Sequence, residues 1–227
     1  MSADTKKKEF LGSLYREGRL YMRHDGTLKR FDHDFPHLAT GKIIPHGVYD
    51  IANNTGFMTL GQSAETPAFV AESIGLWWNY RGRYDYPGVS RILLLMDGGG
   101  ANSSRSHAFK NELIKLATRI DRTIQVAHYP PYCSKWNPIE HRLFPAVTKC
   151  IQGVALESAD TMRHYINERA RTTTGLITRA YVFNKVFSRA NSCAAPVPET
   201  FPFVREKVLP QWNYTCFPSK AYAARLN

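Results

Sequence analysis

The chain has 227 residues and a formal net charge of +11; 43% of its residues are hydrophobic and 22% are charged. This length is sufficient for one domain with a buried core, and the composition is that of an ordinary globular protein. No apolar run reaches the roughly 18 residues of a membrane-spanning helix. Residues 1–12 are polar and lysine-rich, which is not the pattern of a secretory signal. We therefore expect a cytoplasmic protein that is not associated with a membrane.

The positive charge lies toward the two ends of the chain. Residues 1–30 contain eight Lys and Arg against four Asp and Glu, residues 31–140 contain ten of each, and residues 141–227 contain twelve against five. Basic flanks around a neutral middle are typical of a protein that holds a polyanion, although solubility alone also accounts for such an excess. The charge pattern therefore favours a nucleic-acid partner without establishing one.

The four cysteines, Cys133, Cys150, Cys193 and Cys216, are widely separated and form no CxxC pair. This spacing argues against a structural zinc site and against a disulfide framework. We interpret them as reduced thiols.

The first part of the sequence predicts antiparallel strands. Residues 9–22 have the pattern of a strand pair, and residues 24–44 that of an irregular connection. Residues 47–52 and 57–61 are β-prone arms around an Asn-Asn-Thr-Gly turn, which predicts a hairpin.

Helices and strands then alternate along the chain. Helical spacing of apolar residues and capping signals predict helices over 66–82, 104–119, from Pro138 onward and over 158–172, and apolar runs predict strands over 91–96 and 123–128. The prolines after Ala194 predict an extended tail. This order predicts an α/β protein with a mixed sheet flanked by helices, in which 91–96 and 123–128 are parallel neighbours.

Asp97 is the first candidate for a working acid. It directly follows the predicted strand 91–96 and precedes three glycines. Ligands of open α/β sheets gather beyond the carboxyl ends of strands, and glycines allow close approach. The alternative is that Asp97 caps the following helix.

Glu140 is the second candidate. The segment Asn137-Pro138-Ile139-Glu140 also has the pattern of a capping box, which alone accounts for a glutamate at this position. However, Glu140 shares a helix face with apolar Leu143, Phe144 and Val147, where an acid has to be paired, neutral or metal-bound. One helix and one strand separate it from Asp97, so the two carboxylates are able to converge. Convergent oxygen ligands favour Mg²⁺ or Mn²⁺ over zinc.

The segment 128–144, which reads HYPPYCSKWNPIEHRLF, resembles the PPY…NPIE block of mariner-like and related insertion-sequence transposases. The chain as a whole resembles the DDE domain of the ISAzo group, the Rhodopirellula-type transposase DDE domain, at residues 4–9, 49–56, 97–100, 134–137, 139–144, 172–175 and 211–215. The resemblance covers nearly the whole chain. It implies a ribonuclease H-like catalytic domain over 1–175, followed by a C-terminal extension over 176–227 that packs on it or trails from it.

The resemblance also implies a site and a chemistry. The metal-binding catalytic triad becomes Asp4, Asp97 and Glu140, and the chemistry is DNA cleavage and strand transfer with two Mg²⁺ or Mn²⁺ ions. The partners implied are transposon-end and target DNA, bound by a homo-oligomer in a synaptic complex. Residues placed to contact DNA are Lys6, Lys7, Lys8, Lys135, Asn137 and Arg142, although each lysine taken singly also suits a solvated surface.

Two features depart from the family pattern, and one position competes with a triad residue. Only three residues precede Asp4, about 10 Å of strand at ~3.3 Å per residue, so we expect a truncated first strand and an N-terminally truncated copy of a transposase. Pro145 should end or kink the helix that bears Glu140 near Phe144, since an interior proline costs about 3 kcal/mol. Asp50, on the first hairpin arm, competes with Asp4 as the first carboxylate.

Three other functions compete with transposition. A nuclease of the same fold would cut DNA without joining it, and a DNA-binding remnant would do neither. A methyltransferase would use Asp97-Gly-Gly-Gly as its cofactor loop, but a hairpin precedes that loop where a doubly wound sheet is needed. No GK[ST] follows a glycine-rich loop, which argues against a P-loop ATPase.

Overall fold

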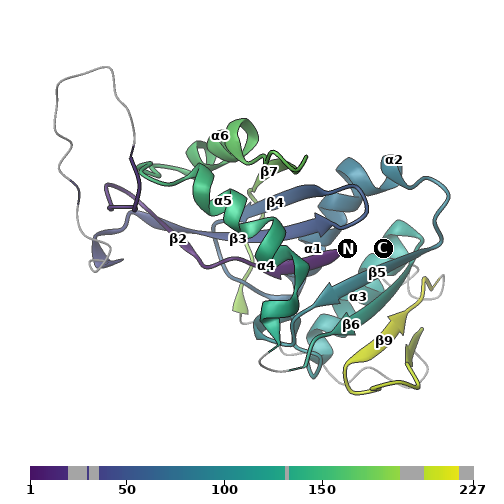
Figure 1. The fold of residues 1–227 in the computed structure, drawn as a ribbon. Helices are drawn as coiled ribbons and strands as arrows, with labels where there is room; N and C mark the ends of the chain where they lie inside the picture. Colours follow the sequence, from purple (N-terminus) through teal and green to yellow (C-terminus); the bar gives the residue numbers. More distant parts are fainter. Residues whose placement is uncertain (20–29, 31–35, 131–132, 190–201, 220–227) are drawn as a thin grey trace.

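The computed structural model describes residues 1–19, 30, 36–130, 133–189 and 202–219. Its centre is a mixed nine-stranded sheet with the order β7-β4-β3-β1-β5-β6-β9-β8, with β2 paired to β3 (Figure 1). The strands are β1 (Ser2–Thr5), β2 (Glu9–Leu11), β3 (Gly41–Asp50), β4 (Thr55–Gly61), β5 (Arg91–Met96), β6 (Thr123–His128), β7 (Ile177–Phe183), β8 (Phe203–Arg205) and β9 (Asn213–Cys216). The predicted α/β class and mixed sheet are confirmed.

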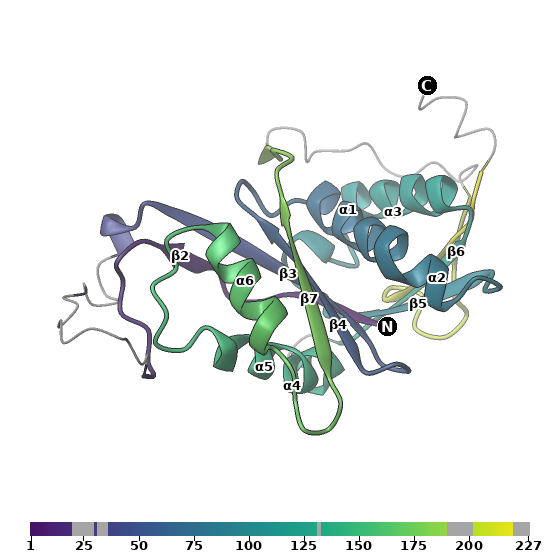
Figure 2. The same ribbon diagram turned by 90° about the horizontal axis from the view of Figure 1, so that it is seen from above.

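Helices cover both faces of this sheet (Figure 2). One face carries α1 (Pro67–Trp77) and α3 (His107–Ile120), whose apolar residues form one core cluster with Val48, Leu94 and Val126. The other face carries α4 (Pro138–Arg142), α5 (Phe144–Cys150) and α6 (Ala159–Arg169), which form a second cluster with Ile43 and Met58. Short helical turns complete the set: η1 (Pro36–Leu38), η2 (Trp78–Gly82), α2 (Arg83–Asp85), η3 (Gly100–Asn102) and η4 (Ser134–Trp136).

The predicted hairpin is confirmed as β3 and β4, which pair antiparallel from Ile44↔Gly61 to Asp50↔Thr55. β3 begins earlier than predicted, at Gly41, because its other edge pairs with both β1 and β2. The predicted strand pair over 9–22 is wrong within residues 9–19, since β2 pairs with β3 and residues 12–19 form no strand. Residues 20–22 lie outside the described part of the chain.

Strands β5 and β6 have the predicted bounds and run parallel, from Arg91↔Thr123 to Met96↔His128. Helix α3 makes the crossover between them and is capped by the Ser106 side chain. β1 lies on the other side of β5 and is also parallel to it. The carboxyl ends of β1, β5 and β6 therefore lie at the same end of the sheet.

The helix predicted to stop at Gly82 continues through η2, a π-helical turn, into α2. Gly82 keeps helical dihedral angles, and a Cβ there would lie 2.7–2.8 Å from atoms of Trp77 and Trp78. The glycine therefore permits close packing of the two indoles and does not terminate the helix.

The extended tail predicted after Ala194 is wrong where the structure describes it. Residues 203–205 and 213–216 are strands, and β9 pairs antiparallel with β6 at the edge of the sheet. β7, also unpredicted, pairs parallel with β4 at the opposite side. Residues 194–201 lie outside the described residues. Within the described ranges, no helix combines the length and apolar character needed to cross a bilayer.

Candidate active site

Asp4 and Asp97 are neighbours across two parallel strands. β1 and β5 pair in the register Ala3↔Met96, so Asp4 and Asp97 are the next residues along each strand. Asp4 is 8% exposed, and Asp97, just beyond the end of β5, is half-buried. The strand end that the sequence singled out for Asp97 is therefore also the end at which Asp4 lies.

Glu140 reaches these aspartates because α4 and α5 pack very close to β3 and β4. A Cβ on Gly47 would lie 2.8 Å from the Phe144 ring and 2.9 Å from Ile139, and one on Gly56 would lie closer still to Leu143. Two glycines thus admit the side chains that flank Glu140.

The break predicted from Pro145 is also present. α4 ends at Arg142, and α5 begins at Phe144 with Pro145 in its first turn. Proline is compatible with a first turn, where its missing N–H is not needed. Glu140 precedes the break and remains helical.

Asn137 does not play either role predicted for it. Its side chain makes no cap hydrogen bond, so the predicted capping box is not formed. Instead, its Oδ1 accepts a short hydrogen bond from the Ser2 hydroxyl, and its Nδ2 donates to Asp4 Oδ2 over 3.4 Å. It is 0% exposed and therefore unable to contact a DNA phosphate, so its assignment to DNA binding is corrected. Asn137 ties the start of α4 to β1.

The three carboxyl groups interact electrostatically. Burial, the negative charge of Asp97 and the proximity of Glu140 raise the pKa of Asp4 to about 8, against the opposing effect of the Thr5 N–H. Burial and the charge of Asp97 also raise the pKa of Glu140, while a hydrogen bond from Asp4 lowers it. Without a cation, Asp4 therefore retains its proton near neutral pH, and the protonated carboxyl is able to donate a hydrogen bond to Glu140.

Asp97 is held by its own loop. Its Oδ1 accepts hydrogen bonds from the Asn102 side chain at 3.1 Å and from the Gly99 N–H at 3.3 Å. Its backbone carbonyl lies 2.9 Å from His128 Nδ1. Sequence reasoning did not single out Asn102 or His128; the only signal was that His128 ends the strand beside β5.

This donor set has the chemistry of a divalent-cation site. All three side chains offer oxygen ligands, and burial together with the charge of Asp97 raises the pKa values of Asp4 and Glu140, a shift that a cation would oppose. Among the described residues, no three His, Cys, Asp or Glu side chains already converge as a metal-binding group. The residues fit a cation in type and charge, and binding one would draw the carboxylates together.

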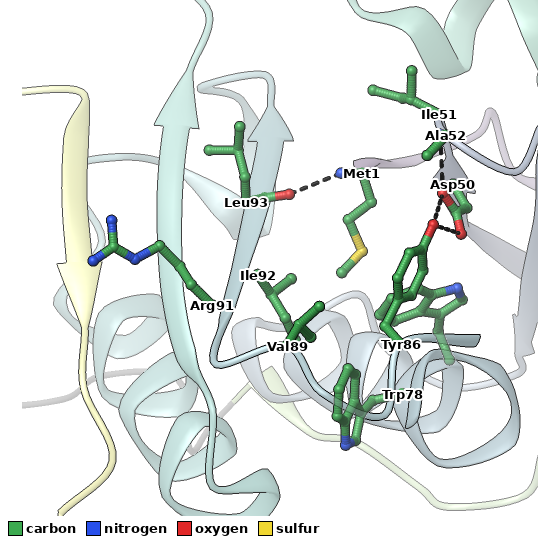
Figure 3. A pocket seen from close by; sticks show the side chains of 11 residues that line it. Met1, Asp50, Ile51, Ala52, Trp78, Tyr86, Val89, Arg91, Ile92 and Leu93 are labelled. Carbon is green, nitrogen blue, oxygen red and sulfur yellow. Dashed lines mark hydrogen bonds between the residues drawn. The ribbon is translucent and has the colours of Figure 1, made fainter. Parts of the chain in front are cut away.

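Asp50, the alternative first carboxylate, forms hydrogen bonds away from the other two acids. Both of its oxygens accept hydrogen bonds from the Tyr86 hydroxyl, at 2.9 and 2.8 Å, and Oδ1 also accepts one from the Ala52 N–H (Figure 3). It lines an apolar cavity of about 330 Å³ together with Met1 and Ile92. Because Ser2 pairs with Tyr49, Asp50 lies beside Met1, at the opposite end of β1 from Asp97. The structure favours Asp4.

The predicted basic residues lie in different surroundings. Lys6 and Lys7 line an open groove of about 600 Å³ with Glu140, and Lys6 pairs with Glu9 at 2.7 Å. Lys8 is 3.8 Å from Glu65 and is not among the residues that line this groove.

The remaining basic residues lie around α4. Lys135 is exposed and lies over the Trp136 ring, and Arg142 is exposed. The groove also contains Thr148, Lys149 and Gln152, which the sequence did not single out. Helical spacing from Glu140 could not reveal them, because α4 ends at Arg142 and α5 begins at Phe144 after a break.

Comparison with known proteins identifies the fold and the family of the chain. One solved structure, a Mos1 transposase paired-end complex with the left transposon end, matches with a TM-score of 0.50 at 12% sequence identity. The match covers 74% of this chain and 46% of that one, so this chain spans less than half of the neighbour's length. It supports the ribonuclease H-like fold. No curated protein matches the chain. The family model of the Rhodopirellula transposase DDE domain matches residues 1–218, and the chain therefore belongs to this family of transposase DDE domains.

Proposed function

We propose that this chain carries the catalytic carboxylates of a DNA transposase, which cut and join DNA by phosphoryl transfer with two Mg²⁺ or Mn²⁺ ions. The observation that carries the proposal is the placement of Asp4, Asp97 and Glu140 at one end of the sheet, where their charges act on one another. Neighbouring acids repel each other unless a cation or a proton offsets their charge. A structural role would not require this arrangement.

Each carboxylate has a distinct part. Asp97, held in place by its loop, would be the fixed ligand, whereas Asp4, whose pKa is raised, would have to lose its proton, together with Glu140, to hold a cation. The ions would activate the attacking water or DNA 3′-hydroxyl and stabilise the leaving oxygen. Asn137 keeps Asp4 and α4 together during this change.

We propose that DNA lies along the groove beside Glu140. Lys6, Lys7 and Lys149 line this groove and are suited to neutralising backbone phosphates. Lys135 and Arg142, exposed around α4, extend the basic surface. These contacts read the backbone and not the bases. Joining two transposon ends would require two copies of the site, so we propose a homo-oligomeric working form.

The experiment is nicking of supercoiled plasmid, and joining of a pre-nicked duplex, by the purified chain in Mn²⁺ or Mg²⁺. We expect metal-dependent cutting and joining that Asp97→Asn or Glu140→Gln abolishes. Asp160→Asn is the matched control, since Asp160 is an exposed acid on α6 that forms an ion pair with Arg163. Cutting without joining would indicate a nuclease. Metal-independent DNA binding without cutting would indicate a non-catalytic DNA-binding protein and contradict the proposal.

A further inference from the structure

The C-terminal hairpin of β8 and β9 reaches the candidate site through one buried side chain. β9 pairs with β6 in the register Val126↔Tyr214, two residues before His128. Tyr214 is 0% exposed, and its ring lies 5.6 Å from that of His128 and 5.2 Å from that of Phe203. A segment more than 110 residues away along the chain from Asp97 thus contacts the residue that ends β6.

His128 connects Tyr214 to Asp97. Its Nδ1 lies 2.9 Å from the Asp97 carbonyl oxygen, and its Nε2 lies 3.1 Å from the Tyr214 hydroxyl. A carbonyl oxygen only accepts hydrogen bonds, so Nδ1 carries the proton. In the neutral ring Nε2 is then an acceptor, and the Tyr214 hydroxyl donates a hydrogen bond to it. The bonding pattern therefore fixes both the tautomer and the ring orientation.

The tyrosine is itself immobilised. Lys110, on α3, is 2% exposed and places its ammonium 5.7 Å from the centre of the Tyr214 ring and 6.0 Å from that of Phe203. α3 and the hairpin thus enclose the tyrosine. The hydrogen bond to His128 therefore costs the Tyr214 side chain little conformational entropy, because packing already restricts it.

The backbone of Asp97 needs such a support. It lies at the junction between β5 and a loop of three glycines, where the chain has great conformational freedom. Asn102 and Gly99 hold the Asp97 carboxylate, but both belong to that same loop. His128 supplies the hydrogen bond from outside it.

We propose that Tyr214 and His128 are positioning residues for Asp97, so that the C-terminal hairpin forms part of the candidate active site. The proposal rests on the proposed function, in which Asp97 is a metal ligand. Neither residue touches the reacting atoms. Groups that orient metal ligands from outside the coordination shell typically change metal affinity by about 10–100-fold when removed.

The test is titration of the full chain with Mn²⁺, followed by the paramagnetic resonance of the free ion, together with ¹⁵N spectra of the histidine rings without metal. For Tyr214→Phe we expect Mn²⁺ binding about tenfold weaker, the low end of that range because the support acts on the backbone. We also expect a shift of the His128 ring signals. His128→Ala should weaken binding at least as much, and His128→Asn, whose amide is able to donate in place of Nδ1, should weaken it less.

Tyr49→Phe is the control, because Tyr49 is 4% exposed and also loses one side-chain hydrogen bond, to Asn54 at 2.9 Å, at a place remote from Asp97. Thr215→Val is a second control, for loosening of the hairpin, because the Thr215 hydroxyl donates a hydrogen bond to Glu206 within the hairpin. If Mn²⁺ binds and requires Asp97, but Tyr214→Phe binds as tightly as Tyr49→Phe, the positioning role is wrong and the proposed function stands. If the unsubstituted chain binds no Mn²⁺, both proposals fail.

Discussion

The Asp4 and Glu140 carboxyl groups interact, each affecting the pKa of the other, although the two residues lie 136 positions apart in the chain. Two acids that share a proton in a partly buried site are under electrostatic strain whenever that proton is lost. The same contact marks where a cation would be most strongly bound. Several measurable properties of the protein depend on this one relationship.

The first prediction concerns the dependence of stability on pH without metal. The folded pKa of Asp4 is about 8 and its ordinary value is 3.8, so between these values the folded state binds more protons than the unfolded state. The contribution of Asp4 to the free energy of unfolding should therefore fall as pH rises from about 4 to 8, by at most about 1.4 kcal/mol per pH unit.

Urea unfolding at successive pH values in EDTA checks this prediction. Asp4→Asn should reduce the decline and be the more stable protein at pH 8, whereas Asp160→Asn should keep it. Added Mn²⁺ should also offset the decline. An Asp4→Asn variant that is less stable than the unsubstituted protein at pH 8 would contradict the shared proton.

The second prediction concerns His46, whose contribution to stability should change with pH in the opposite direction. It is fully buried on β3 against Phe69, and neither ring nitrogen hydrogen-bonds another described residue. Burial lowers its pKa from 6.5 to about 3. The unfolded state therefore binds more protons between these values, and this contribution to stability is lost as pH falls from about 6.5 toward 3.

Replacing His46 by leucine removes this titration while keeping a similar volume. The free energy of unfolding of His46→Leu should decline less than that of the unsubstituted protein between pH 6 and pH 4, as measured by urea unfolding. His164→Leu, on the surface of α6, is the control. Equal declines in the His46→Leu and unsubstituted proteins would contradict the lowered pKa of His46.

The glycines beneath α4 give a packing prediction. Gly56→Ala should destabilise the fold by about 1–3 kcal/mol, the usual cost of overpacking, because the new Cβ would collide with Leu143. It should also displace Glu140 and weaken Mn²⁺ binding. Gly88→Ala is the matched control, since a Cβ there has no atom within 4 Å. Equal stability of the two variants would show that α4 does not lie this close to β4.

The groove gives a prediction about salt. DNA binding by the chain should weaken as salt rises, because releasing counterions from phosphates drives it. Lys7→Gln with Lys149→Gln should reduce the slope of log K against log salt by about 2, near 0.9 for each phosphate that is no longer neutralised. Fluorescence anisotropy with a labelled duplex measures this. Lys115→Gln, on α3 and thus on the face of the sheet opposite α4 and α5, should leave the slope unchanged, and a fall equal to that of the double variant would place the DNA elsewhere.

Most of the fold could be predicted because its signals are local. The run 91–96 and the turn 53–56 define strands by composition and turn chemistry alone. β7 and β9 were missed because each is stabilised by a partner far away in sequence, β4 and β6, and not by its own pattern. Gly82 was misjudged because its role is to fit two indole rings, which spacing does not show.

In the site, too, the residues with local signals could be predicted and the contacts between distant segments could not. Asp97 and Glu140 could be predicted from strand ends and helix faces, and Asp4 only through the resemblance. The supports could not be predicted, since Asn137 resembles a helix cap but bonds to Ser2 and Asp4 across the fold. The link from Tyr214 through His128 joins three separate segments, and no local pattern reveals it.

The central claim is that Asp4, Asp97 and Glu140 bind the ions of a phosphoryl-transfer site. Its most direct test is the anomalous scattering of Mn²⁺ in crystals of the chain grown or soaked with that ion. We predict a peak coordinated by oxygens of Asp97 and of Asp4 or Glu140 at about 2.1 Å, with the carboxyls drawn closer together and the proton between Asp4 and Glu140 lost. A peak bound to other groups, with Asp4 and Glu140 still sharing their hydrogen bond, would contradict it.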